Sequence, residues 1–318
     1  MMRTHRHALR TGAAALIAAA LGAGALGCGS GDTAAPMVTE VVTVTSGAPS
    51  EQASAPSSGS AKPSAPAGSG GAPAPAGSRG NAAKLTAAFE TLRPTLSQPV
   101  GISIAPVGGG AVISLGDQAP RVAWSTIKVP LALAAERQNG VSGAETGAIV
   151  SSDNAAAEQL WSSLGSPENA AAAVEAVLRE GGDKNTTVPS ERLRPEFSIF
   201  GQTQWSLNDA AVFTAHLPCL PGAGHVVELM GQVAANQQWG LEVIENRATA
   251  VKGGWGPASD GSYLVRQIGL LTRKDGSQTA FALSTFAAGS TLDTGIAALN
   301  QAGRWIGTQL AALPAGSC

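Results

Sequence analysis

The chain has 318 residues, including 40 glycines and 19 prolines; 44% of the residues are hydrophobic, but only 4% are aromatic and 13% charged. A chain that is globular throughout does not have this composition, so part of it must be of low complexity. Twenty basic and 22 acidic residues give a formal net charge of -2. Because nucleic-acid-binding proteins usually carry a clustered basic excess, this balance argues against nucleic acid as a partner.

Residues 1–27 are predicted to be a secretory signal peptide. Arg3, Arg6 and Arg10 precede an uncharged, Ala-rich run of about 17 residues. This run is short for a membrane span of about 20 residues, but it suits the apolar part of a signal peptide. We therefore expect an extracytoplasmic location.

The end of this segment, Ala25-Leu26-Gly27-Cys28, resembles a bacterial lipobox. That resemblance implies that Cys28 is acylated and anchors the mature chain to the outer face of the cytoplasmic membrane. The segment departs from the lipobox pattern, which prefers Leu three residues before the Cys. The alternative is ordinary cleavage after Ala25, because Ala23 and Ala25 form an A-x-A site.

Three cysteines leave one unpaired after any disulfide in an exported chain. Cys28, the candidate for acylation, is expected to be the cysteine without a disulfide partner. Cys219 and Cys318 would then be free to form a disulfide in an oxidising compartment and to pin the C-terminal end.

Residues 28–80 are predicted to be a linker, because residues 47–80 consist almost entirely of Ala, Pro, Ser and Gly. Such a segment cannot bury enough apolar surface to offset its ordering entropy. At about 5 to 6 Å times the square root of its length, it would hold a domain several tens of Å from the membrane. Residues 81–318 are then expected to form one folded domain.

Within this domain, hydrophobic periodicity predicts a helix, a two-stranded hairpin, a helical block from Ser125 to about Val233, three strands and a last helix. The expected bounds are 82–92 for the first helix, 100–106, 111–115, 248–253, 263–272 and 278–286 for the strands, and 292–313 for the last helix. Turns are expected at Gly256-Pro257 and Asp275-Gly276. This order favours an α/β chain of the α+β type: a five-stranded antiparallel sheet flanked by the terminal helices, plus an all-helical subdomain.

Three short motifs occur in one order: Ser125-Thr126-Ile127-Lys128, Ser152-Asp153-Asn154 and Lys252-Gly253-Gly254. Ser and Lys three apart on a helix share a face, with about 5 to 6 Å between Cβ atoms, so the amine can take the hydroxyl proton. Ser125 is therefore the candidate nucleophile. Lys128 can be its base if burial and a positive neighbour lower its pKa from about 10.4. Lys252 would supply that neighbour and attract a substrate carboxylate.

These motifs resemble S-x-x-K, S-D-N and K-T-G of the penicillin-recognising serine hydrolases, which include class A β-lactamases and D-alanyl-D-alanine transpeptidases and carboxypeptidases. Asn236-Gln237-Gln238-Trp239-Gly240-Leu241 also looks like the corresponding stretch of class A enzymes. The chain further resembles alanine-rich lipoproteins of mycobacteria and related actinobacteria that carry this fold. The resemblance covers the whole folded part and implies the β-lactamase/transpeptidase-like fold.

It also implies acyl transfer through an acyl-Ser125 intermediate. Ser152 would pass a proton to the leaving nitrogen, and Asn154 would hold the substrate amide. The backbone N–H groups of Ser125 and Trp255 would form the oxyanion hole. Lys252, Gly254 and Trp255 would bind a small-molecule or peptidoglycan-derived acyl substrate.

Three departures from the family pattern bear on activity. Ser125 and Ser152 are only 27 positions apart, about half the class A separation, which predicts a more open cleft. Gly253 replaces the hydroxyl residue that helps to bind a substrate carboxylate in the family. The region that contains Glu191 and Glu196 lacks the E-x-x-L-N deacylation motif, so any acyl-enzyme formed with a β-lactam is expected to be long-lived.

Each motif also has an ordinary structural interpretation. Ser152-Asp153-Asn154 could be a helix N-cap, Lys252-Gly253-Gly254 a strand end, and Ser125 an exposed helix start. In the loop residues 197–205, Gln202 and Thr203, with the preceding Glu196, are candidates either for lining the cleft or for packing the loop.

Neither a metal site nor a cofactor is predicted. His216 and His225 are expected to be surface or structural residues, because with Cys219 they would make an irregular set of three zinc ligands.

The sequence thus favours a monomeric, membrane-tethered lipoprotein with a serine hydrolase domain, acting as a weak β-lactamase or D,D-peptidase. One alternative is a catalytically silent relative that binds peptidoglycan or another envelope partner. Another is an esterase that uses the same Ser125 and Lys128 on small acyl esters.

Overall fold

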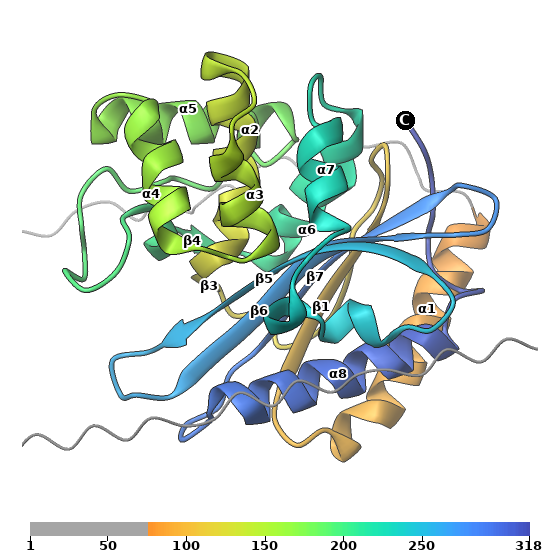
Figure 1. Ribbon diagram of the computed structural model, residues 1–318. Helices are drawn as coiled ribbons and strands as arrows, with labels where there is room; N and C mark the ends of the chain where they lie inside the picture. The colour runs from red at the N-terminus through yellow and green to blue at the C-terminus, as the bar shows by residue number, and fades with distance from the viewer. Residues whose placement is uncertain (1–75) are drawn as a thin grey trace, which may run out of the picture. The chain divides into compact units, whose positions relative to one another are not determined.

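Five strands form one antiparallel sheet at the centre of residues 76–318, the part of the chain that the computed structural model describes (Figure 1). The signal peptide, Cys28 and nearly all of the linker lie outside these residues. The strand order is β2-β1-β7-β6-β5, so both predicted strand groups join one sheet and the predicted fold class is confirmed. The strands are β1 (Val100–Pro106), β2 (Ile113–Gly116), β5 (Ala248–Pro257), β6 (Tyr263–Thr272) and β7 (Gln278–Thr285).

The two terminal helices, α1 (Ala76–Leu92) and α8 (Leu292–Thr308), cover one face of the sheet (Figure 1). Their apolar sides form a core with that face, in which the rings of Phe89 and Trp305 meet edge to face. The three inner strands are buried almost throughout, because both faces of the sheet are covered.

The other face carries the helical block, with α6 packed directly on β1 and β7. Its helices are short, and four of them begin at Ser or Asp side chains that accept hydrogen bonds from their first turn. They are α2 (Lys128–Asn139), α3 (Gly143–Val150), α4 (Asn154–Ser163), α5 (Pro167–Glu180), α6 (Leu207–His216) and α7 (Gly224–Met230).

A small second sheet pairs β3 (Arg121–Val122) with β4 (Gln204–Trp205). The sequence pattern predicted neither strand, because two residues are too few to show an alternation. Short 3-10 turns join the main elements: η1 (Arg93–Thr95), η2 (Trp124–Ile127), η3 (Phe200–Gln202), η4 (Leu217–Cys219), η5 (Ala235–Gln237) and η6 (Gly240–Val243).

Several element ends differ from the predicted ones. The first helix begins at Ala76, directly after Pro75, rather than near residue 82. β5 continues through Gly256-Pro257, where a turn was expected, and the chain reverses over residues 258–262 instead. Proline is tolerated there because β5 is an edge strand.

The last helix ends at Thr308 rather than near residue 313.

Within residues 76–318, no single helix is long and apolar enough to cross a membrane. Only the bent helix pair Leu207–Cys219 and Gly224–Met230 has, taken together, the length and composition of a membrane span.

A disulfide joins Cys219 to Cys318 across 99 positions. Gly316 and Gln278 exchange two backbone hydrogen bonds beside it, so the C-terminal tail lies along the start of β7. Replacing both cysteines with serine is expected to lower the free energy of unfolding by about 3 to 5 kcal/mol, because a loop of about 100 residues is released in the unfolded chain. Urea unfolding of the variant beside oxidised wild type measures this; equal midpoints would contradict it.

Candidate functional site

Ser125 lies in the 3-10 turn η2, one turn before α2 begins at Lys128. It is half-buried. The residue before it, Trp124, has a φ of 46°, and Ser152 has a φ of 58°. Non-glycine residues seldom adopt this left-handed region, and such strain gathers at functional sites. Two of the three non-glycine residues in this region among residues 76–318 therefore belong to or adjoin the predicted motifs.

Lys128 connects the first motif to the second. Its side chain is 1% exposed, and its Nζ donates to Ser152 O at 2.7 Å, Asp153 O at 3.1 Å and Asn154 Oδ1 at 2.8 Å. The short separation between Ser125 and Ser152 thus does not keep the motifs apart. In residues 76–318, the Ser125 hydroxyl itself makes no hydrogen bond.

The environment of Lys128 suits a base. Burial lowers the pKa of its amine to about 8, although the negative charges of Asp153 and Glu158 raise it in part. All three acceptors around the amine are uncharged, so no ion pair holds the proton in place. A neutral amine is therefore accessible near physiological pH.

Lys252 connects the second motif to the third. It has no exposed surface, and its Nζ donates to Ser152 Oγ at 2.8 Å, Gln237 Oε1 at 2.5 Å and Gly253 O at 2.9 Å. Burial, followed by the charge of Lys128, lowers its pKa. The three hydrogen bonds of its amine are therefore all made to acceptors within the protein.

Gln237 is a site residue to which the sequence analysis gave no role. It is fully buried; its Oε1 also accepts from Gly253 N at 3.0 Å, and its Nε2 donates to Ile149 O and Val150 O, both at 2.8 Å. It therefore ties β5 to the end of α3. The stretch from Asn236 to Leu241 was singled out for its resemblance to class A enzymes, but nothing in the sequence distinguished Gln237 from Gln238.

The glycines of the third motif set how close β5 lies to Ser125. A Cβ on Gly254 would be 2.9 Å from Ala123 O and 3.0 Å from Ser125 N, so only glycine lets the edge strand pass this turn. A Cβ on Gly253 would be 2.7 Å from Trp239 Cζ2. The indole ring thus occupies the space that a side chain at position 253 would need. Trp255 follows, half-buried, with its ring 6.3 Å from that of Trp239.

The second motif combines a helix cap with two contacts to the candidate site lysines. Asp153 is the N-cap of α4 and accepts from Ala156 N at 2.7 Å. Ser152 and Asn154, on either side of it, hold the two lysines, and Asn154 is exposed. Asp153 therefore caps the helix while its neighbours belong to the site.

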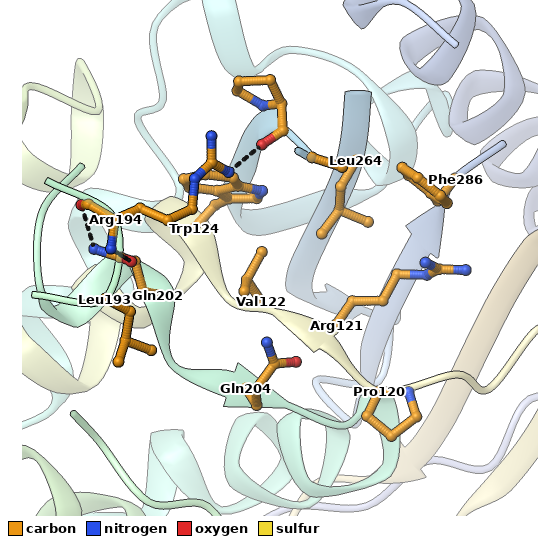
Figure 2. A pocket seen from close by; sticks show the side chains of 12 residues that line it. Pro120, Arg121, Val122, Trp124, Leu193, Arg194, Gln202, Gln204, Leu264 and Phe286 are labelled. Atoms are coloured by element: carbon orange, nitrogen blue, oxygen red, sulfur yellow. Dashed lines mark hydrogen bonds between the residues drawn. The ribbon is translucent and has the colours of Figure 1, made fainter. Parts of the chain in front are cut away.

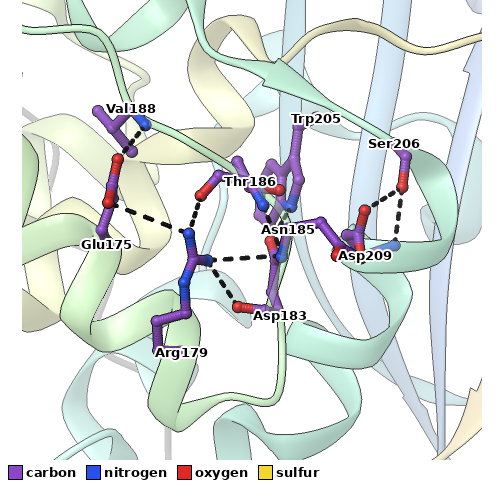
Figure 3. Close-up of polar contacts among 9 residues, drawn as sticks. All are labelled: Glu175, Arg179, Asp183, Asn185, Thr186, Val188, Trp205, Ser206 and Asp209. Atoms are coloured by element: carbon purple, nitrogen blue, oxygen red, sulfur yellow. Dashed lines mark hydrogen bonds and ion pairs between the residues drawn. The ribbon is translucent and has the colours of Figure 1, made fainter. Parts of the chain in front are cut away.

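The loop between α5 and α6 is fastened at both ends by Asp183 (Figure 3). This buried carboxylate accepts from the backbone N–H groups of Asn185 and Thr186, both at 3.0 Å, and from Trp205 Nε1 at 2.9 Å. The guanidinium of Arg179 donates to Asp183 O at 2.7 Å. These contacts join the end of α5 to β4 and hold the loop in one conformation.

The two glutamates of the loop lie at the surface. Glu191 and Glu196 are exposed, and Glu196 is paired with Arg194 at 2.9 Å. Hydrogen bonds to its own backbone and to Arg194 lower the pKa of Glu196. Gln202 and Thr203 are buried and bond to the backbone of the loop. Both therefore pack the loop, and Gln202 also lines a cavity that the loop helps to form.

A buried guanidinium on β6 bonds to the backbone of the β3–β4 sheet. Arg266 is 1% exposed and donates to Arg121 O, Val122 O and Trp205 O at 3.0 to 3.1 Å. Burial lowers its pKa to about 9. Arg266 thereby fastens the small β3–β4 sheet, which leads into Ser125, to the central sheet.

The two histidines have structural partners. His216 Nδ1 lies 2.9 Å from Val212 O, and His225 Nδ1 lies 2.6 Å from Glu136 Oε1. Among residues 76–318, no three His, Cys, Asp or Glu side chains are grouped as metal ligands would be.

The sequence matches no protein-family model and no curated protein sequence. Solved structures similar to the chain include the TLA-3 extended-spectrum β-lactamase, at 13% identity and a TM-score of 0.60 over 72% of this chain and 99% of that one. The putative class A β-lactamase PenP from Rhodopseudomonas palustris is also similar, at 17% identity and a TM-score of 0.55 over 71% of this chain and 99% of that one.

A variant of the class A β-lactamase of the last common ancestor of Gram-negative bacteria gives 17% identity and a TM-score of 0.54, over 72% of this chain and 98% of that one. The chain therefore has the fold of the class A serine β-lactamases. At these identities the likeness extends to the fold alone.

Proposed function

We propose that this protein is a cell-envelope lipoprotein whose domain forms an acyl-enzyme on Ser125 and transfers acyl groups from amide or ester substrates. The observation that carries the proposal is the buried Lys128, three residues after Ser125, with a pKa lowered to about 8. Weak β-lactamase or D,D-peptidase activity on a small-molecule or peptidoglycan-derived substrate is the specific form. The domain needs no cofactor and acts as a monomer.

The contacts of the two lysines with the second motif support an acylation mechanism. Lys128 removes the proton from the Ser125 hydroxyl, and Ser152, which accepts a hydrogen bond from Lys252, returns a proton to the leaving group. The N–H groups of Ser125 and Trp255 receive the developing oxyanion, a device worth about 2.7 to 4 kcal/mol per donor. Asn154 holds the substrate amide.

Deacylation of a β-lactam adduct is expected to be slow. The α5–α6 loop lacks the E-x-x-L-N motif, its two glutamates are exposed, and Glu196 is paired with Arg194. A penicillin should therefore leave a long-lived adduct on the protein.

A second candidate is a catalytically silent module that binds peptidoglycan or another envelope partner. One observation favours it: the Lys128 amine donates to three acceptors of the second motif, while the Ser125 hydroxyl makes no hydrogen bond in the described part of the chain. Catalytic hydrogen bonds often form only once substrate is bound. Reactivity toward probes separates the two candidates.

The deciding experiment incubates the purified protein with a penicillin and, separately, with a fluorophosphonate, and measures intact mass beside Ser125→Ala. The proposal expects both adducts on wild type only, and a penicillin adduct that persists. Absence of both adducts from a folded protein would support the silent module. Turnover of nitrocefin at tens per second or more would contradict slow deacylation.

The acylation rate is expected to rise with pH. Below a pKa of about 8 the amine of Lys128 is mostly protonated and cannot accept the Ser125 proton, so the rate should climb tenfold per pH unit. Above that pKa the rate should level off. Fluorophosphonate labelling between pH 5.5 and pH 9.5 measures this profile; a rate that falls as pH rises would exclude Lys128 as the base.

The lipid anchor makes its own prediction. Cys28→Ser should move the protein from the membrane fraction to the soluble extracytoplasmic fraction, because no acyl chain can be attached. Cell fractionation with an antibody against the domain measures this, with Cys219→Ser as the control that keeps the anchor. Retention of Cys28→Ser in the membrane would contradict lipidation.

A further inference from the structure

A cavity of about 290 Å³ lies between the β3–β4 sheet, the α5–α6 loop and the β5–β6 turn (Figure 2). Trp124, the residue before Ser125, is part of its lining. Its walls are mainly apolar. This volume is just below the usual range for small-molecule sites, about 300 to 1,000 Å³. The apolar walls are formed by Pro120, Val122, Leu193, Pro257, Leu264 and Phe286.

Two buried N–H donors in the wall have no partner. Trp124 is 7% exposed, and its indole Nε1 makes no hydrogen bond; Arg121 Nε is likewise buried and unbonded. A buried donor without an acceptor costs about 1 to 3 kcal/mol. Figure 2 shows both side chains around the same space as Val122 and Leu264. A ligand with an acceptor oxygen would satisfy these donors.

The charged side chains that line the cavity are both arginines. Its lining contains Arg121 and Arg194 and no carboxylate. The partners of these arginines, Asp117 and Glu196, are each 2.9 Å away and lie outside the lining. The guanidinium of Arg121 also stacks on the Phe286 ring, with 4.5 Å to the centroid, so its position is fixed before any ligand arrives.

We propose that this cavity is a binding site for a small carboxylic acid with an apolar, preferably aromatic, body. The carboxylate accepts from Trp124 Nε1 and Arg121 Nε, and the body lies against Val122, Leu264 and Phe286. Leu193, which also lines the cavity, is 67% exposed and adds apolar surface on the solvent side.

The cavity is separate from the Ser125 cleft. The ring of Trp124 lies against β5, where a Cβ on Gly256 would be 2.5 Å from Cε2, and Phe197 packs edge to face on it at 4.9 Å. Ser125 does not line the cavity. A bound acid would therefore contact the residue before the nucleophile without occupying the place of the acyl group, and its binding requires no catalysis.

The test uses phenylacetate as the probe and phenylacetamide as its neutral match, titrated into the purified protein by calorimetry. Phenylacetate should bind with a Kd below about 1 mM, and the amide at least about tenfold more weakly. Labelling the six tryptophans with ¹⁵N gives the position: phenylacetate should shift the indole N–H signal that Trp124→Phe removes.

Arg121→Met should raise the Kd for phenylacetate by about tenfold or more. The matched control is Arg93→Met, which removes an arginine that is likewise paired with a carboxylate, that of Glu90, but lies outside the cavity; its Kd should equal that of wild type. Ala258→Phe, which fills the cavity rim, should abolish binding even if Arg121→Met fails to fold. Equal affinity for acid and amide, or shifts confined to other tryptophans, would overturn the proposal.

Discussion

Lys128→Met is expected to slow the reaction of Ser125 with a fluorophosphonate by about 10² to 10⁴-fold, the usual contribution of a general base. Methionine keeps the volume and apolar character of the buried stem, so the substitution removes the amine and little else. The amine donates to three uncharged acceptors, two backbone carbonyls and Asn154 Oδ1. Because none of them is a carboxylate, no ion pair opposes the loss of its proton. The rate of adduct formation by intact mass is the measurement.

The control for this experiment is Lys84→Met, which removes an exposed lysine of α1 and should leave the rate unchanged. Circular dichroism shows whether Lys128→Met is folded. If a folded Lys128→Met protein reacts as fast as wild type, another group activates Ser125 and the proposed mechanism is wrong.

Gln237→Leu is expected to lower the free energy of unfolding by about 3 to 5 kcal/mol and to slow acylation of Ser125. Leucine has nearly the same volume, but the carbonyls of Ile149 and Val150, the N–H of Gly253 and the amine of Lys252 each lose a partner in the interior. Each buried group left unpaired costs about 1 to 3 kcal/mol. Without this acceptor, Lys252 is less firmly held against Ser152.

Gln238→Leu is the matched control, because Gln238 is the next residue, is exposed and makes one side-chain hydrogen bond, to Val233 O. Its unfolding free energy should change by less than about 1 kcal/mol. Urea unfolding and fluorophosphonate labelling of both variants give the two readouts. Equal stability of the two variants would show that the Gln237 network contributes nothing.

Local sequence patterns were sufficient to predict most of the fold. Alternation and helical periodicity gave the five strands and the terminal helices, because a side chain's spacing along one element reflects which face that element buries. The errors fall where such patterns are weakest. β4 has two residues, and β5 extends past Pro257 because an edge strand does not need that N–H group.

The candidate site was predictable as far as its residue types carry chemistry. A serine and a lysine three apart, followed by Ser152-Asp153-Asn154 and Lys252, form a pattern that can be recognised in sequence. The partners of these residues could not be found this way. Gln237 and Arg266 act through contacts with segments 61 to 145 positions away in the chain, and no local pattern records such contacts.

The sequence thus established the order of the elements and singled out the candidate reactive groups, since both depend on side-chain chemistry and short-range spacing. Tertiary packing established the rest. The lowered pKa of Lys128 depends on burial by other elements, and the close passage of Gly254 by Ser125 depends on where β5 lies. The unpaired donors of Trp124 and Arg121 likewise exist only because folding excludes water from them. Burial and long-range contact are properties of the folded chain, so they could be read only from its structure.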